Sequence, residues 1–234
     1  AAVGDVTRGE ESKSRLIPST RDIFDFLGLD VIGQDKAKRV LAVACHKHLK
    51  RAFLPKEGVS VDKSNIMLIG PTGTGKTLLV ESLANRLGVP FVKASANDFT
   101  SAGYIGGNLE DLIGMMKAAA NGNAERASRC IVFLDEVDKI RRSNGDGDSK
   151  DVNGRALQQQ LLTFIQGKVI DGVDTSKTLF IFGGSFAGIE SIVQARIDRQ
   201  NDTGSSIGFG ATNLPGDQKK LTQGELLAQV TTGD

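Results

Sequence analysis

The chain has 234 residues, of which 39% are hydrophobic and 24% charged, with a formal net charge of +1 at pH 7. These values are ordinary for a globular protein, and the near-neutral charge gives no argument for a nucleic acid or a membrane surface as partner. No apolar run approaches the length of about 18 residues that marks a membrane span, and no signal-peptide pattern opens the chain. We therefore expect a protein that is neither membrane-spanning nor secreted.

The first part of the chain is expected to lead into two helices. Residues 1–17 are polar and charged, so we expect them to be poorly ordered. Ser19, with Asp22 three positions later, is typical of a capped helix start, and we expect this helix to end at Gly28. The segment 31–35, Val-Ile-Gly-Gln-Asp, is expected to turn into a longer helix.

Cysteine and histidine are too sparse for a zinc site. Cys45 and Cys130 are the two cysteines, which make neither a disulfide framework nor a zinc motif. We expect both to be buried thiols in a reducing compartment. His46 and His48 are two positions apart on a predicted helix and point to different faces. Zinc is therefore not an expected cofactor.

From residue 65 onward, apolar runs alternate with segments of helical spacing. Strands are predicted at 65–69, 90–95, 131–135 and 178–183, and helices at 76–87, 109–120, 152–166 and 187–198. Strands that alternate with helices imply a parallel sheet with right-handed crossovers and helices on both faces. The predicted fold class is therefore a three-layer α/β/α domain.

Residues 70–77 read Gly-Pro-Thr-Gly-Thr-Gly-Lys-Thr and match the phosphate-binding loop G-x-x-x-x-G-K-[ST]. A predicted strand precedes this loop and a predicted helix follows it, and a helix N-terminus favours a bound anion. This context disfavours the alternative of a glycine-rich turn that binds nothing. The residues expected to bind nucleotide here are Pro71, Thr72, Gly73, Thr74, Gly75, Lys76, Thr77 and Leu78.

A second motif supplies acids at the same edge of the predicted sheet. The apolar run 131–134 ends in Asp135-Glu136, and ligands of open α/β sheets bind at the carboxyl ends of the strands. In such sites the first acid holds Mg²⁺ through its water and the second polarises the attacking water. The alternative is that these acids simply begin a solvated loop. ATP hydrolysis with Mg²⁺ is the function that the two motifs predict together.

Two glycine-rich segments carry apolar side chains that core packing explains poorly. Tyr104 and Ile105 are bracketed by Gly103 and Gly106 after the second predicted strand, and a Tyr tucked into the domain is the alternative. The run 204–211 contains Ile207, Gly208 and Phe209 among small and polar residues. Docking against a partner would explain these side chains, and packing back on the domain is the alternative.

These motifs occur in the same order in a known family. The resemblance rests on the segments 31–34, 70–77, 103–106, 131–140, 183–188 and 207–211. Together they resemble the ClpX family of AAA+ unfoldases, from about Leu16 to the last residue. The resemblance implies a P-loop NTPase fold of the AAA+ type, with the predicted strands in the spatial order first, fourth, third, second.

The resemblance also implies roles for the matching residues. Val31 and Ile32 would flank the adenine of ATP or ADP, while Lys76 and Thr77 would bind phosphate and Mg²⁺. Of the acids, Asp135 would hold Mg²⁺ and Glu136 would activate water, so that Glu136, Lys76 and Asp135 form the catalytic set.

Further implied roles concern partners. Tyr104 and Ile105 would grip unfolded or tagged protein substrates in the axial pore of a homo-hexamer. Ile207, Gly208 and Phe209 would dock into a ClpP-type peptidase. The implied location is the cytoplasm of a bacterium or the matrix of an organelle.

Several departures from the family are expected to matter. The family's N-terminal zinc domain is absent, Gly107-Asn108 replaces an acidic pair, and the second pore loop is shortened at 167–174. The sequence given is expected to be a large AAA+ domain over 18–234 that is truncated before the fifth strand, the arginine finger and sensor 2. The first strand would then be an exposed sheet edge, and hydrolysis by this chain alone is expected to be slow or absent.

Three functions are therefore compared. The first is an ATP-dependent protein unfoldase subunit, which the loops at 104–105 and 207–209 favour. The second is a nucleotide-binding module that does not hydrolyse ATP. The third is a DNA-directed AAA+ motor, which the near-neutral charge and the lack of a basic strip with interleaved aromatics disfavour.

Overall fold

The computed structural model describes residues 17–53, 62–99, 109–140 and 158–202. The chain divides into two compact units, Ala1–Ser185 and Phe186–Asp234. The first unit contains the sheet and its helices. The second contains helix α8 (Ile189–Asp202), which begins close to the predicted position and runs somewhat further. The loops at 104–105 and 207–209 lie outside the described residues.

The first unit is built on a four-stranded parallel sheet. Its strands are β1 (Ile66–Ile69), β2 (Phe91–Ser95), β3 (Ile131–Asp135) and β6 (Leu179–Gly184). Their spatial order is β1-β6-β3-β2, and all three pairings are parallel. The predicted strands and their predicted order are therefore confirmed.

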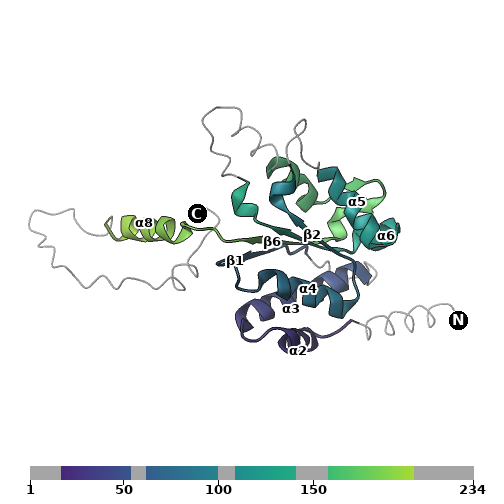
Figure 1. Cartoon of the computed structure of the whole chain (residues 1–234), viewed down its shortest axis with the longest axis horizontal. Coiled ribbons are helices and arrows are strands. Elements are labelled where there is room, and N and C mark those ends of the chain that lie inside the picture. The colour runs from purple at the N-terminus through teal and green to yellow at the C-terminus, as the bar shows by residue number, and fades with distance from the viewer. Residues whose placement is uncertain (1–16, 54–61, 100–108, 141–157, 203–234) are drawn as a thin grey trace, which may run out of the picture. The chain divides into compact units, whose positions relative to one another are not determined.

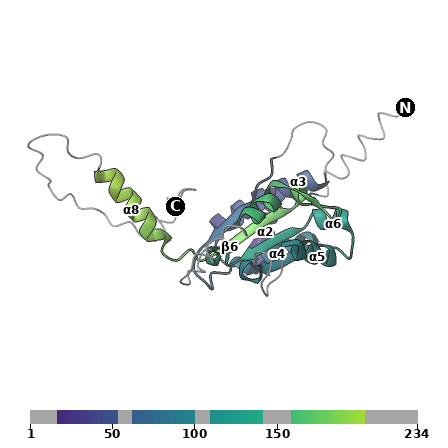
Figure 2. The same cartoon turned by 90° about the horizontal axis from the view of Figure 1, so that it is seen from above.

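Helices cover both faces of the sheet, as Figure 1 shows. One face carries α2 (Thr20–Asp30), α3 (Asp35–Phe53) and α4 (Lys76–Leu87), and the other carries α5 (Leu109–Ala119) and α6 (Ala124–Ser128). A helical stretch at 158–166 packs on the α5 side through Leu161 and Phe164. Figure 2 looks along the direction in which the layers are stacked. The three-layer α/β/α fold is confirmed.

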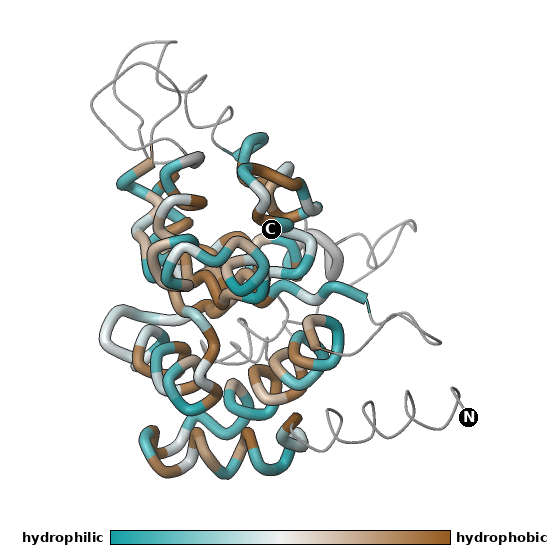
Figure 3. The backbone as a smooth tube through the Cα atoms, turned by 90° about the vertical axis from the view of Figure 1, so that its right-hand side faces the viewer, coloured by the Kyte–Doolittle hydropathy of each residue, from teal (hydrophilic) through white to brown (hydrophobic). Residues whose placement is uncertain are grey.

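Alternate residues of the central strands enter two separate cores. In β3, Ile131 and Phe133 pack with α2, α3 and α4, whereas Val132 and Leu134 pack with α5. β6 is buried along its whole length, whereas Met67 of the edge strand β1 is 53% exposed. Burial on both faces explains why the central strands read as continuous apolar runs. In Figure 3 the helices alternate between the hydrophilic and the hydrophobic colour along their length.

Three local features differ from expectation or were not predicted. The prediction that the first helix ends at Gly28 is wrong, because α2 continues to Asp30, which accepts hydrogen bonds from Arg86 of α4. A short hairpin, β4 (Val169–Ile170) with β5 (Val173–Asp174), precedes β6. Its turn uses positive φ angles at Asp171 and Gly172, which is the backbone that an Asp-Gly hairpin turn requires. The third feature is the short helix α6.

Buried polar groups fasten the amino edge of the sheet. Lys63, just before β1, donates to the carbonyls of Ile165 at 2.7 Å and Thr175 at 2.8 Å. His48 of α3 is 1% exposed, and its Nε2 lies 3.1 Å from the carbonyl of Arg129. A carbonyl only accepts, so Nε2 carries the proton. Burial lowers the pKa of His48 to about 4, and the charges of Arg51 and Lys63 act in the same direction.

We predict that His48 makes the fold sensitive to acid. The folded pKa of His48 lies below its ordinary value of 6.5, so the unfolded state binds a proton more readily than the folded state. The fold therefore keeps its full stability above pH 6.5 and loses stability as the pH falls towards 4. A shift of this size corresponds to roughly 3 kcal/mol. Urea unfolding of the wild type between pH 7.5 and 4.5 should show a falling midpoint that His48→Gln flattens. His46→Gln, on the same helix, should retain the wild-type dependence. Equal pH dependence in wild type and His48→Gln would contradict the prediction.

Candidate functional site

The glycine-rich loop connects β1 to α4 in the predicted strand–loop–helix arrangement. Gly73 and Gly75 adopt left-handed φ angles of 84° and 82°, which side chains other than glycine rarely adopt. The amide of Gly70 donates to the carbonyl of Gly184 at 3.2 Å and so continues the β1–β6 pairing into the loop. The amides at the start of α4 lack partners in the preceding turn, which makes this end a favourable place for an anion.

Side-chain donors occupy the carbonyl groups of the loop. Lys76 Nζ donates to the carbonyls of Gly70 at 2.7 Å and Pro71 at 2.9 Å. Thr74 Oγ1 donates to the Pro71 carbonyl at 2.9 Å. From outside the loop, Gln34 Nε2 donates to the Thr74 carbonyl at 2.9 Å. These hydrogen bonds to its carbonyl oxygens therefore hold the backbone of the loop in place.

The two predicted Mg²⁺ ligands lie together. Thr77 Oγ1 donates to Asp135 Oδ2 at 3.3 Å, which joins the first turn of α4 to the end of β3. The other oxygen, Asp135 Oδ1, accepts from the amide of Glu136 at 2.9 Å. A hydroxyl and a carboxylate are oxygen ligands of the kind that Mg²⁺ takes, with phosphate oxygens and water completing its shell. The residues present therefore fit a Mg²⁺–nucleotide complex.

Glu136 is held by three neighbouring side chains. Its carboxylate pairs with Lys139, and its Oε2 accepts from Asn97 Nδ2 at 2.6 Å and Ser95 Oγ at 3.3 Å. Hydrogen bonding to Lys139 is the main cause that lowers the pKa of Glu136, so the group is a carboxylate at neutral pH. The residue has a positive φ of 59°. A non-glycine residue in this region is strained, and such strain clusters at functional sites.

The end of β6 completes the edge. Asp138 accepts from the amide of Ser185 at 3.3 Å and from its hydroxyl at 3.0 Å. Two positions before Ser185, Gly183 of β6 leaves no room for a side chain. A Cβ there would lie 2.7 Å from Phe133 Cζ and 2.8 Å from Asp135 Oδ1. The carboxylate of Asp135 therefore depends on a glycine in the adjacent strand.

These groups surround one cavity of about 340 Å³. Its lining residues are Thr72, Gly73, Gly75, Lys76, Thr77, Leu78, Asp135, Glu136, Asp138, Lys139, Gly184 and Ser185. It combines a phosphate-binding loop, a pair of oxygen ligands for Mg²⁺ and a carboxylate able to polarise water. Among the described residues, no group of three or more His, Cys, Asp or Glu could hold a metal ion by itself.

Most of the predicted nucleotide-binding residues lie in this cavity, but not all do. Pro71 and Thr74 belong to the loop without lining the cavity. Val31 is 6% exposed and packs in the core, and Ile32 is 99% exposed, and neither lines the cavity.

Sequence reasoning missed several side chains of the site. Ser95, Asn97, Lys139 and the Asp138–Ser185 pair received no role, although 131–140 and 183–188 were recognised as motifs. A usable signal existed for Asn97, since the carboxyl ends of parallel strands meet at one edge and it follows β2 by two positions.

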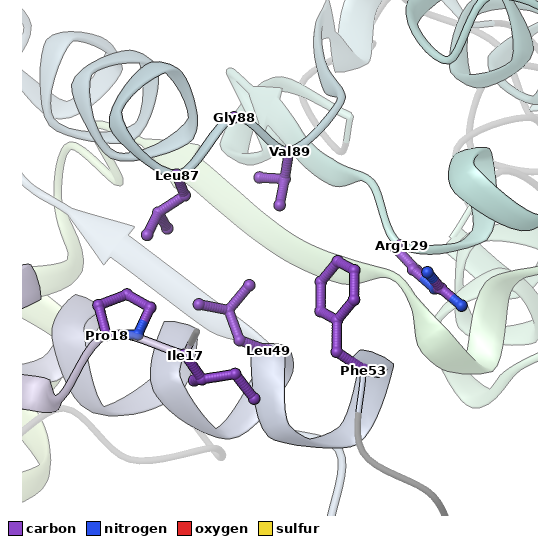
Figure 4. Close-up of a pocket in the computed structure, with 8 residues that line it drawn as sticks. All are labelled: Ile17, Pro18, Leu49, Phe53, Leu87, Gly88, Val89 and Arg129. Carbon is purple, nitrogen blue, oxygen red and sulfur yellow. The ribbon is translucent and has the colours of Figure 1, made fainter. Parts of the chain in front are cut away.

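A second cavity of about 380 Å³ lies at the amino edge of the sheet (Figure 4). It is lined by Ile17, Pro18, Leu49, Phe53, Leu87, Gly88, Val89 and Arg129. Its walls are mainly apolar, and the Arg129 guanidinium carbon lies 4.8 Å from the centre of the Phe53 ring. It contains none of the loop or acidic residues, so the smaller cavity is the candidate nucleotide site.

The fold and the site define a P-loop nucleotide-binding domain. The family model described as "ATPase family associated with various cellular activities (AAA)" matches residues 66–217. The chain belongs to this AAA family.

Curated relatives narrow the similarity. The chain is 40% identical over 240 residues to the ATP-dependent Clp protease ATP-binding subunit ClpX of Treponema denticola, covering 95% of this chain and 56% of the relative. The ClpX subunits of Borrelia duttonii and Borrelia recurrentis are each 38% identical over 218 residues, covering 85% of this chain and 50% of the relative. The chain thus spans about half the length of the curated relatives it matches.

Within the described ranges, no helix is both long and apolar enough to cross a bilayer.

We predict that Gly183→Ala disturbs Asp135 specifically. The added methyl group would overlap Phe133 and the Asp135 carboxylate, and overpacking of this kind costs about 1–3 kcal/mol. Thermal unfolding should occur at a lower temperature, and ATP titrations should lose more affinity in Mg²⁺ than in EDTA. Gly114→Ala is the matched control, because a Cβ at that position of α5 meets nothing within 4 Å. Unchanged Mg²⁺-dependent affinity in Gly183→Ala would refute the role of the close approach.

Proposed function

We propose that this chain binds ATP with Mg²⁺ and hydrolyses it, as part of an ATP-dependent protein unfoldase. The observation that carries the proposal is the convergence of Lys76, Thr77, Asp135 and Glu136 on one cavity. Loop amides and the Lys76 ammonium would bind the phosphates, and charge-assisted contacts of this kind are strong. Bound Mg²⁺ would neutralise charge on the terminal phosphates.

Glu136 is the proposed general base, and its surroundings constrain how it works. A general base needs water within hydrogen-bond reach and a free carboxylate oxygen. Lys139, Asn97 and Ser95 compete for those oxygens. A carboxylate has about four acceptor sites, so these three donors leave little room for the attacking water, and loss of one of them would open the carboxylate to it. Asn97 and Lys139 would therefore govern when Glu136 acts.

The unfoldase part of the proposal is supported by the similarity to ClpX subunits. We propose a homo-hexamer whose Tyr104 and Ile105 contact substrate polypeptide in an axial pore. Ile207, Gly208 and Phe209 would dock a ClpP-type peptidase. The proposed location is the cytoplasm of a bacterium or an organelle matrix, with neither nucleic acid nor membrane as partner.

Glu136→Gln is expected to bind nucleotide but not to turn it over, because an amide does not accept the proton of water. ADP and ATP affinities by calorimetry should stay within about threefold of wild type, while phosphate release by a hexamer-forming version of the protein falls to background. Lys76→Ala is the contrasting variant and should lose binding itself. Turnover by Glu136→Gln at the wild-type rate would remove Glu136 from its role. A hexamer-forming wild type that binds nucleotide without any turnover would instead favour the nucleotide-binding module.

Substitutions in the loops at 104–105 and 207–209 are expected to impair different activities in a form of the protein that assembles with a ClpP-type peptidase. Phe209→Ala should weaken peptidase association by about 2 kcal/mol or more per contact if the ring is an interface anchor, with a larger loss across a ring of such contacts. Tyr104→Ala should leave association intact but slow degradation of a folded, tagged substrate. Normal association by Phe209→Ala, or wild-type degradation by Tyr104→Ala, would assign that loop a purely structural role.

A further inference from the structure

Gln34 makes a contact with the phosphate loop that packing does not explain. Its side-chain amide reaches across 40 positions of sequence to donate to the Thr74 carbonyl at 2.9 Å. The residue is exposed and does not line the nucleotide cavity. Its backbone carbonyl accepts from the amide of Lys38 at 3.0 Å and starts α3, so the side chain is not needed for that start.

The contact fixes the direction of one peptide group in the loop. In a planar trans peptide, the C=O and the following N–H point in opposite directions. A Thr74 carbonyl held towards Gln34 therefore turns the amide of Gly75 away from Gln34. Gly75 lines the cavity, whereas Gln34 does not, so an amide turned away from Gln34 could face the phosphate side. Because Gly75 has a wide choice of backbone angles, this peptide would rotate readily without an anchor.

The segment that carries Gln34 is itself tied to α4. Asp30 accepts from Arg86 Nη2 at 2.6 Å and Nε at 3.0 Å and also pairs with Ser82. These contacts lower the pKa of Asp30 to about 2, and Arg86 is the main cause. Residues 31–33 therefore run between two anchors, one on α4 and one on the phosphate loop. An anchored segment can hold a loop carbonyl in place, whereas a free one cannot.

The backbone at Gln34 indicates that the length of this side chain matters. Its φ is 59°, next to Gly33 at 73°, and Asn or Gly adopts such angles more easily than Gln does. Asn carries the same amide group but is one methylene shorter. A longer side chain in a conformation that suits Asn better is explained if the amide must reach Thr74.

We propose that Gln34 is a positioning residue that orients the Thr74–Gly75 peptide so that its amide faces the phosphates of a bound nucleotide. The inference rests on the proposed nucleotide site. It predicts that Gln34 acts on the phosphate part of the ligand and leaves the nucleoside part unaffected.

The test compares the full chain with Gln34→Asn, which keeps the amide and suits the backbone but loses the reach. Gln34→Gly is the second variant, because it relieves the positive φ and so preserves the fold. Displacement of a fluorescent ADP analogue gives the affinities of ADP, inorganic tripolyphosphate and adenosine. Loss of one hydrogen bond should weaken ADP and tripolyphosphate by roughly 3- to 10-fold in both variants. Adenosine affinity and the unfolding temperature of the free protein should stay at wild-type values.

Gln194→Asn is the matched control, since it removes a similar exposed contact, from Gln194 Nε2 to Asp198 at 2.8 Å in α8, and should change no affinity. Unchanged tripolyphosphate affinity in Gln34→Asn and Gln34→Gly overturns the inference, whatever happens to adenosine. An equal loss for all three ligands with a lowered unfolding temperature also overturns it, because that pattern belongs to general destabilisation. A wild type that binds none of the ligands refutes the nucleotide site itself, and the inference with it.

Discussion

Burial of β3 and β6 on both faces determines where every part of the candidate site lies. The two strands share their core residues with helices above and below, so neither strand can shift without breaking both cores. The register of β6 with β1 sets Gly184 beside Ile69, which brings the end of β6 to the start of the phosphate loop. The same packing brings Asp135 to Thr77. Contacts that join the ends of different strands, such as those of Asn97 with Glu136 and of Ser185 with Asp138, depend on this sheet packing.

The three carboxylates of the site are each held by a local contact. Asp135, Glu136 and Asp138 lie within four positions of one another, and like charges so close would repel. Each is held by a different donor: Thr77 for Asp135, Lys139 for Glu136 and Ser185 for Asp138. Among these, only the Glu136 contact is an ion pair. Of these three acids, Glu136 is also the one with a positive φ, so the group proposed to act on water combines an ion pair with a strained backbone.

The sequence predicted the parts of this structure that depend on local patterns. Continuous apolar runs identified the strands, and α4 ends at Leu87 as predicted, where Gly88 adopts a left-handed conformation. Contacts between elements were less predictable. Nothing local indicates that α2 should pass Gly28, and the contact that ties its last residue, Asp30, to α4 comes from Arg86, 56 positions further along the chain. The hairpin at 169–174 was also not predicted, although the Asp-Gly pair at its turn is a sequence signal for a hairpin.

The residues of the segment 31–34, which the family resemblance treats as one motif, have different environments in the structure. Resemblance implied the same adenine contact for Val31 and Ile32, but their side chains have opposite environments, one in the core and one at 99% exposure. A buried Val31 can offer a ligand little more than its backbone, while Ile32 has an entire apolar side chain free to cover a base. Burying such a side chain stabilises by about 1.5–3 kcal/mol. The motif therefore separates into three tasks: Val31 anchors the segment in the core, Ile32 is available for an apolar ligand, and Gln34 reaches the phosphate loop.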